Sequence, residues 1–333
     1  SQQLVDVLSS SNAWQVRRAR RILAERRDKQ VIDQLRTLSQ NPDNPSLALQ
    51  ALWTLNTLGA FDQNRESSLL AHQDPHIRAW TIRLIGDTKQ VSDENGQKLL
   101  SIAKTDTSPT VISQLASSAK RLPAKQCIAL VRTLLNRSEF SIDPHIPLLT
   151  WWALERYSIS SLPEVLQAFS RPGDWQNPFL REVILGRLMR RYAGEGSNAS
   201  LVACARLLAA APEKTERRRM ISELDAGLKM LGRERLPGLP LGPKYGNIAA
   251  ITRVEKSNQV TRLKTLPPEL ADQLTTIWDD KTTDPLIIRV AMRLGSKAAY
   301  DRALALATDK TCTEKARLEM LAILQELGES DEC

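Results

Sequence analysis

The chain has 333 residues, 42% of them hydrophobic and 25% charged, a composition typical of a folded, soluble protein. Its formal net charge is +8, a mild excess that is compatible with an anionic partner but does not by itself indicate nucleic acid. No apolar stretch approaches the roughly 20 residues that span a bilayer, so the sequence excludes a transmembrane helix. Period-two runs of Val, Ile and Thr are hard to find, which argues against a sheet.

A recurring dipeptide, a small polar residue followed by proline, marks the organisation of the chain. Successive prolines are first 30, 34, 35 and 34 residues apart, and the last gap of 107 residues is about three more periods. The polar residue can cap a helix, and proline at the first helical position lacks an N–H that would find no partner there. A period in this range predicts an all-α, HEAT-like α-solenoid of about eight or nine helical pairs. The dipeptides are Asn44-Pro45, Asp74-Pro75, Ser108-Pro109, Asp143-Pro144, Asn177-Pro178 and Asp284-Pro285.

Helical periodicity predicts the individual elements along the chain. Residues 232–247 contain three prolines and four glycines, so we expect an irregular loop there, either a plain connection or an insertion that touches a partner. We treat residues 1–333 as a single helical-repeat domain. The predicted helices cover residues 12–23, 29–39, 47–58, 65–72, 77–85, 96–105, 111–122, 125–136, 146–157, 162–169, 179–192, 199–211, 213–231, 268–278, 286–294, 298–308 and 313–327.

Residues that could carry chemistry are few and scattered. The sequence contains no phosphate-binding glycine loop, no metalloprotease or hydrolase motif, and no CxxC or CxxCH pair. We therefore expect no catalytic, cofactor-binding or metal-binding residue and no enzymatic activity in this chain. The isolated residues considered are Cys127, Cys204, Cys312, Cys333, His72, His76 and His145.

Two arginine clusters are the only residues that we single out for contact with a partner. Residues 1–36 carry a net charge of about +4, and residues 181–219 about +5. We interpret both clusters as solvated helix faces, with Arg20 at the margin of the apolar stripe where a neighbouring repeat could pack. The alternative is that they contact phosphates in a nucleic-acid-binding HEAT module. The clusters comprise Arg17, Arg18 and Arg21, and Arg217, Arg218 and Arg219.

Tryptophans lie within several of the predicted helices. Trp80 follows Ile77 by three residues and precedes Leu84 by four, which places it on the buried stripe. We expect Trp53 and Trp80 to fill the gap between stacked helices. The alternative is an aromatic platform beside arginines, and the periodicity argues against it for these two rings.

Four strings carry a family resemblance: ALWTL at 51–55, DPHIRAW at 74–80, QLASSA at 114–119 and PLLTWWALE at 147–155. They resemble the HEAT region of the planctomycete-type membrane-bound dehydrogenases, also described as haem-binding CxxCH proteins. In that family the region looks like a spacer between a sugar-dehydrogenase-like β-propeller and a cytochrome c domain. The proline-opened helices resemble HEAT repeats over nearly the whole chain, whereas the likeness to this family rests on the four strings, and no haem or catalytic residue of the family can be placed on the chain.

The resemblance implies a non-catalytic scaffold that holds flanking domains or a protein partner. It also implies a parent protein with haem c, located in the periplasm or cell envelope. The chain begins Ser1-Gln2-Gln3 without a basic region or an apolar run, so we expect a piece of a longer protein and no signal peptide.

Overall fold

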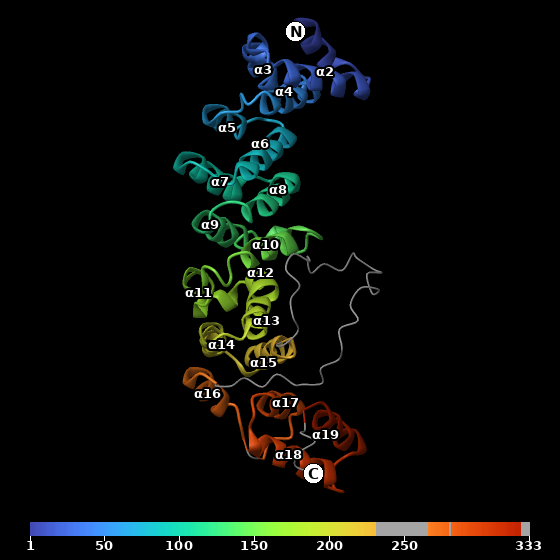
Figure 1. Cartoon of the computed structure of the whole chain (residues 1–333). Helices are drawn as coiled ribbons and strands as arrows, with labels where there is room; N and C mark the ends of the chain where they lie inside the picture. Colours follow the sequence, from blue (N-terminus) through green and yellow to red (C-terminus); the bar gives the residue numbers. More distant parts are fainter. Residues whose placement is uncertain (231–265, 280, 328–333) are drawn as a thin grey trace. The chain divides into compact units, whose positions relative to one another are not determined.

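The computed structural model describes residues 1–230, 266–279 and 281–327 (Figure 1). Helices make up 74% of the structure and no strand occurs among the described residues, which confirms the all-α fold class. No helix in these ranges is both long enough and apolar enough to cross a membrane. The expected loop at residues 232–247 lies outside the described residues.

The chain divides into two compact units, Ser1–Ile184 and Leu185–Cys333. A single domain over residues 1–333 stays a prediction.

The first unit is built from two rows of helices (Figure 1). In what we call the even row, α2, α4, α6, α8 and α10 each pack against the next, and in the odd row α5, α7, α9 and α11 do the same. The helices are α1 (Gln2–Asp6), α2 (Ala13–Arg26), α3 (Ile32–Ser39), α4 (Pro45–Thr57), α5 (Gln63–Leu69), α6 (Pro75–Thr88), α7 (Asp93–Thr105), α8 (Pro109–Ala119), α9 (Ala124–Leu134), α10 (Ile146–Glu155), α11 (Leu162–Phe169) and α12 (Pro178–Leu180).

Most of the polar-proline dipeptides cap helices as the sequence predicts. The Asn44 side chain accepts a hydrogen bond from the Leu47 N–H at the start of α4, and Asp74 accepts from His76 and Ile77 at the start of α6. Ser108 is the exception, because its side chain makes no capping bond although α8 begins at Pro109. The backbone N–H of Ser108 instead donates to the carboxylate of Asp106.

A partly buried ion pair joins α6 to the connection between α7 and α8. Arg78 Nε lies 2.7 Å from Asp106 Oδ2, and Arg78 Nη2 lies 3.1 Å from Oδ1, so the contact is bidentate. Arg78 Nη1 donates to the carbonyl oxygens of His72 and Gln73, which precede α6. Because one guanidinium binds both of these connections, Arg78 fixes the spacing of successive helices.

The second unit contains the remaining described helices. Here α13 packs on α15, α15 on α17 and α17 on α19, while α14 contacts α13, α15 and α16. The helices are α13 (Gly186–Glu195), α14 (Asn198–Ala210), α15 (Lys214–Leu228), α16 (Pro268–Thr275), α17 (Pro285–Arg293), α18 (Lys297–Thr308) and α19 (Glu314–Leu327).

Many sequence-based helix boundaries differ from the structure by up to three residues, and two of the departures have an identifiable reason. The single helix predicted over 179–192 is interrupted by a π-helical turn at Arg181–Leu185. A single wide turn of this kind leaves no mark in a 100° periodicity. Helix α7 begins at Asp93, three residues early, because Ser92 caps it and Gly96 is accommodated in its interior. The short helix α1, Gln2–Asp6, was not predicted at all.

Candidate functional site

Two tryptophans from neighbouring helices of the even row meet edge to face. The ring centroids of Trp53 on α4 and Trp80 on α6 are 4.8 Å apart, with an interplanar angle of 76°. Trp80 packs against buried residues that include Leu52 and Ile77. Both tryptophans are half-buried, so Trp80 packs on the core and between stacked helices as the sequence predicts, but it lies at the margin of the core. A ring at the edge of the core can therefore also face solvent or a ligand.

Each ring is covered by an arginine. The guanidinium carbon of Arg20 lies 5.0 Å from the centroid of Trp53, and that of Arg83 lies 4.9 Å from the centroid of Trp80. These distances are those of cation–π contacts. The rings therefore lie beside arginines, contrary to the sequence-based expectation. We call Arg17, Arg20, Trp53, Trp80 and Arg83 the Arg–Trp surface.

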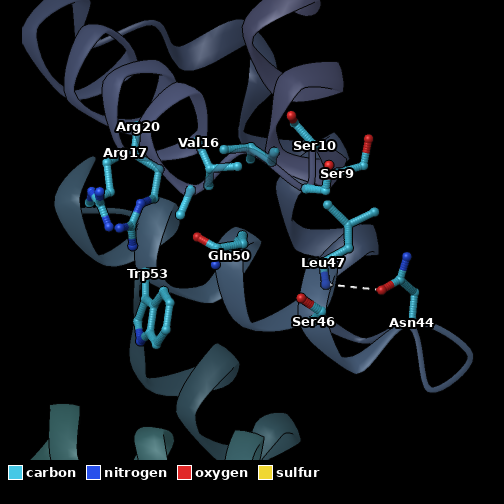
Figure 2. Close-up of a pocket in the computed structure, with 13 residues that line it drawn as sticks. Ser9, Ser10, Val16, Arg17, Arg20, Asn44, Ser46, Leu47, Gln50 and Trp53 are labelled. Atoms are coloured by element: carbon cyan, nitrogen blue, oxygen red, sulfur yellow. Dashed lines mark hydrogen bonds between the residues drawn. The ribbon is translucent and has the colours of Figure 1, made fainter.

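A pocket of about 400 Å³ opens at the α2 end of this surface (Figure 2). In Figure 2 the side chains of Arg17 and Arg20 extend toward the Trp53 ring. Among the described residues, no acidic side chain lines this pocket. The lining residues are Leu8, Ser9, Ser10, Ser11, Ala13, Val16, Arg17, Arg20, Asn44, Ser46, Leu47, Gln50 and Trp53.

Two polar atoms at this pocket are buried without a hydrogen-bond partner in the described part of the chain. They are Oε1 of Gln50, an acceptor, and Nε1 of Trp53, a donor. Leaving a buried polar group unpaired costs about 1–3 kcal/mol, so such atoms are rare in folded proteins. Both atoms belong to residues that line the pocket beside the two cations, but they lie beneath the surface of the protein.

The two arginines of the pocket share a face of α2, because they are three residues apart. Burial, and secondarily the charge of Arg17, lower the pKa of Arg20. Arginine nevertheless stays protonated, so the pocket holds two like charges at neutral pH. An anion placed between these groups would relieve their repulsion.

The structure separates the three arginines that the sequence singled out on the first helix. Arg17 is exposed and lines the pocket. Arg18 stacks on Trp14 at 5.1 Å, and Arg21 forms a 2.7 Å salt bridge with Glu25. Only Arg17 contributes to the pocket. Its partner there is Arg20, which the sequence placed at the margin of the apolar stripe but not among the contact residues.

The second cluster, on α15, is engaged in contacts within the second unit. Arg217 Nε donates to the carbonyl oxygen of Ala211 at 3.3 Å, and Arg218 forms a 3.1 Å salt bridge with Asp284, the residue that caps α17. Arg219 is half-buried. These contacts give Arg217 and Arg218 a role in joining neighbouring segments.

Groups that could support catalysis are dispersed. In the described ranges no set of three or more His, Cys, Asp and Glu side chains could hold a metal ion. Burial raises the pKa of the Cys127 thiol to about 12 and also raises the pKa of Cys204. Since the thiolate is the nucleophilic form, both sulfurs are inert at neutral pH. His72 is buried, and its Nδ1 accepts a hydrogen bond from the Asp74 N–H.

Comparison with protein-family models gives no match to this chain, and no curated protein matches it.

Proposed function

We propose that this chain is a non-catalytic helical-repeat scaffold that binds a protein partner through the Arg–Trp surface. The observation that carries the proposal is the series Arg20, Trp53, Trp80 and Arg83, which runs without interruption across three helices. Tryptophan and arginine dominate the binding energy of protein interfaces, where rings and guanidinium groups supply large, ordered contact areas.

The architecture that we propose is a HEAT-like α-solenoid of about eight or nine helical pairs. The two rows of the first unit support it, because each helix packs on its counterpart one step further along. The recurrent polar-proline caps at α4, α6 and α17 add to this support. Solenoids of this kind present long surfaces to partners.

The sequence resemblance extends this proposal to a parent protein. In it the chain would be the spacer of a larger exported dehydrogenase–cytochrome c protein, located in the periplasm or cell envelope. Haem c would belong to a different part of that protein. The raised thiol pKa values of Cys127 and Cys204 are consistent with a spacer that carries no chemistry of its own.

The engaged arginines favour a protein partner over nucleic acid. Arg21 and Arg218 are paired with carboxylates of the chain, and Arg217 binds a backbone carbonyl. A phosphate would have to displace these partners. These three are half of the six cations on which the alternative of a nucleic-acid-binding HEAT module depends.

Photo-cross-linking tests the proposal. A photoreactive phenylalanine derivative replaces Arg83, which is exposed on α6, and in a matched variant it replaces Lys104, which is exposed on α7 of the odd row. The proposal predicts that position 83 yields one discrete protein adduct in cells of the source organism and that position 104 does not. The same adducts from both positions, or none from position 83, would contradict it. Oxidation of a sugar by the isolated chain in a dye-linked assay would contradict the non-catalytic part.

A further inference from the structure

We infer that the pocket formed by the residue 8–13 segment, α2 and α4 binds an acidic side chain of a peptide together with the adjoining backbone amide. This inference rests on the proposed function and names the chemistry of the partner. Four features of the pocket support it: its charge, its unpaired polar atoms, its apolar wall and its size.

The charge of the pocket selects an anion. Arg17 and Arg20 both line it, and no acidic side chain among the described residues offsets them there. Arg17 is exposed, and the hydrogen bonds found in the described structure leave its guanidinium available to a ligand. A carboxylate can accept two parallel hydrogen bonds from one guanidinium, which makes such pairs both strong and directional.

The unpaired polar atoms narrow the class of anion. Nε1 of Trp53 is a donor and Oε1 of Gln50 an acceptor, and both are buried in the structure. When the two side chains turn toward the ligand, Nε1 donates to a carboxylate oxygen and Oε1 accepts from an N–H or O–H of the ligand. A peptide supplies both, since each residue other than proline carries a backbone N–H beside its side chain. The phosphodiester of a nucleic-acid backbone supplies acceptors only.

The apolar wall and the size of the pocket fit a short peptide segment. Leu8, Val16 and Leu47 line the pocket on the side of the residue 8–13 segment and of the two helices. Leu8 and Val16 are buried and Leu47 is half-buried, so an aliphatic side chain next to the acidic residue would pack mainly against Leu47. The volume of about 400 Å³ lies within the range typical of ligand pockets.

Nuclear magnetic resonance of the ¹⁵N-labelled chain tests the inference. The probe is a blocked tetrapeptide of alternating glutamate and leucine, and the control probe carries glutamine in place of glutamate. The indole N–H signal of Trp53, assigned by its loss in Trp53→Phe, reports on the pocket directly. We expect that signal to shift and saturate with the acidic peptide and to stay in place with the neutral one.

Paired substitutions on α2 give the binding a matched control. Arg17→Gln should lower the affinity for the acidic peptide about tenfold, the effect of losing one charged hydrogen bond. Arg18→Gln makes the same charge change at the neighbouring exposed residue, which stacks on Trp14. It should change the affinity for the acidic peptide less than twofold. Equal losses in both variants would overturn the inference, because they would indicate general attraction to a basic helix.

Two further outcomes would also overturn it. If the acidic peptide leaves the Trp53 signal unmoved, the pocket does not take this ligand. If inorganic phosphate or a DNA oligonucleotide at equal ionic strength shifts the signal as strongly as the peptide does, the pocket is a general anion site. The failure of the inference and that of the proposed function are distinguishable. If the peptide test fails but the protein adduct at position 83 still forms in Arg17→Gln, the proposed function stands and only the pocket inference is wrong.

Discussion

The guanidinium group of Arg20 on α2 lies 5.0 Å from the ring centroid of Trp53 on α4. This contact links two successive helices of the even row across the wall of the pocket. It brings a cation, a ring and an unpaired indole N–H to one place on the surface. The Arg20–Trp53 pair therefore contributes both to the packing of α2 against α4 and to the surface that we propose for partner binding.

Replacing Arg20 should measurably destabilise the first unit. Arg20→Ala removes the cation over Trp53 and the alkyl stem that packs beside it, a loss of about 1 kcal/mol in the free energy of unfolding. Arg17→Ala, on the same helix but exposed, should change that free energy by less than about 0.5 kcal/mol. Urea denaturation followed by circular dichroism measures both, and equal losses would contradict the cation–π interpretation.

Asp106→Asn should destabilise the chain more strongly. It removes the charge that balances the partly buried Arg78, and breaking a buried ion pair on one side costs about 3 kcal/mol. Asp33→Asn is the matched control, because Asp33 pairs with Arg36 at a site where its side chain is 92% exposed. We expect the control to unfold at the urea concentration of the native chain. A loss in Asp106→Asn no larger than in the control would show that Arg78 does not fix the helix spacing.

Glu66 should make the stability depend on pH in a defined direction. Burial raises the pKa of Glu66 above its ordinary value, although a hydrogen bond from Asn95 opposes the shift. The folded state therefore binds the proton of Glu66 more tightly than the unfolded state does. This difference stabilises the folded state fully below the ordinary glutamate pKa, and the stabilisation is lost as pH rises through the folded pKa.

Glu66→Gln should accordingly be more stable than the native chain at pH 7, and the difference should close at pH 4. Glu94→Gln is a control of opposite sign, because hydrogen bonds from Lys98 and Ser67 lower the pKa of Glu94. That variant should be less stable than the native chain at pH 7, and the difference should close as pH falls, because the native chain then loses the contribution of the Glu94 carboxylate. Urea unfolding at the two pH values measures both, and a Glu66→Gln variant that is less stable at pH 7 would contradict the prediction.

Cys127 should resist thiol reagents while the chain is folded. Its side chain is fully buried, and a pKa of about 12 leaves almost no thiolate at pH 8. Mass spectrometry after treatment with an aromatic disulfide should find Cys127 unmodified in the native chain and modified in urea. Rapid modification of the native chain would show that this part of the helix core opens.

The sequence predicted the helices well because their signals are local. A polar residue before proline specifies a helix start at α4 and α6 without reference to the rest of the chain. The π-helical turn at Arg181–Leu185 was missed because it depends on packing rather than on a start or stop residue. Ser108 was misjudged, since α8 begins at Pro109 without a capping hydrogen bond from the Ser108 side chain.

The site was predicted only in part. Arg17 was among the expected contact residues, and Arg20 lay at the margin of the apolar stripe, where a neighbouring repeat could pack. Gln50 carries no sequence signal, because its unpaired Oε1 results from how α4 packs beneath the residue 8–13 segment. The arginines at 217–219 looked equivalent in the sequence, but consecutive helical residues diverge by 100° and meet different neighbours.

The most direct test of the scaffold function is the affinity of the partner captured at position 83. Titration calorimetry compares the native chain, the double variant Arg17→Gln with Arg83→Gln, and the control Lys104→Gln from the odd row. We predict at least a tenfold rise in the dissociation constant for the double variant, about 1.4 kcal/mol or more, and no change for the control. A partner that binds the double variant as tightly as the native chain would contradict the account.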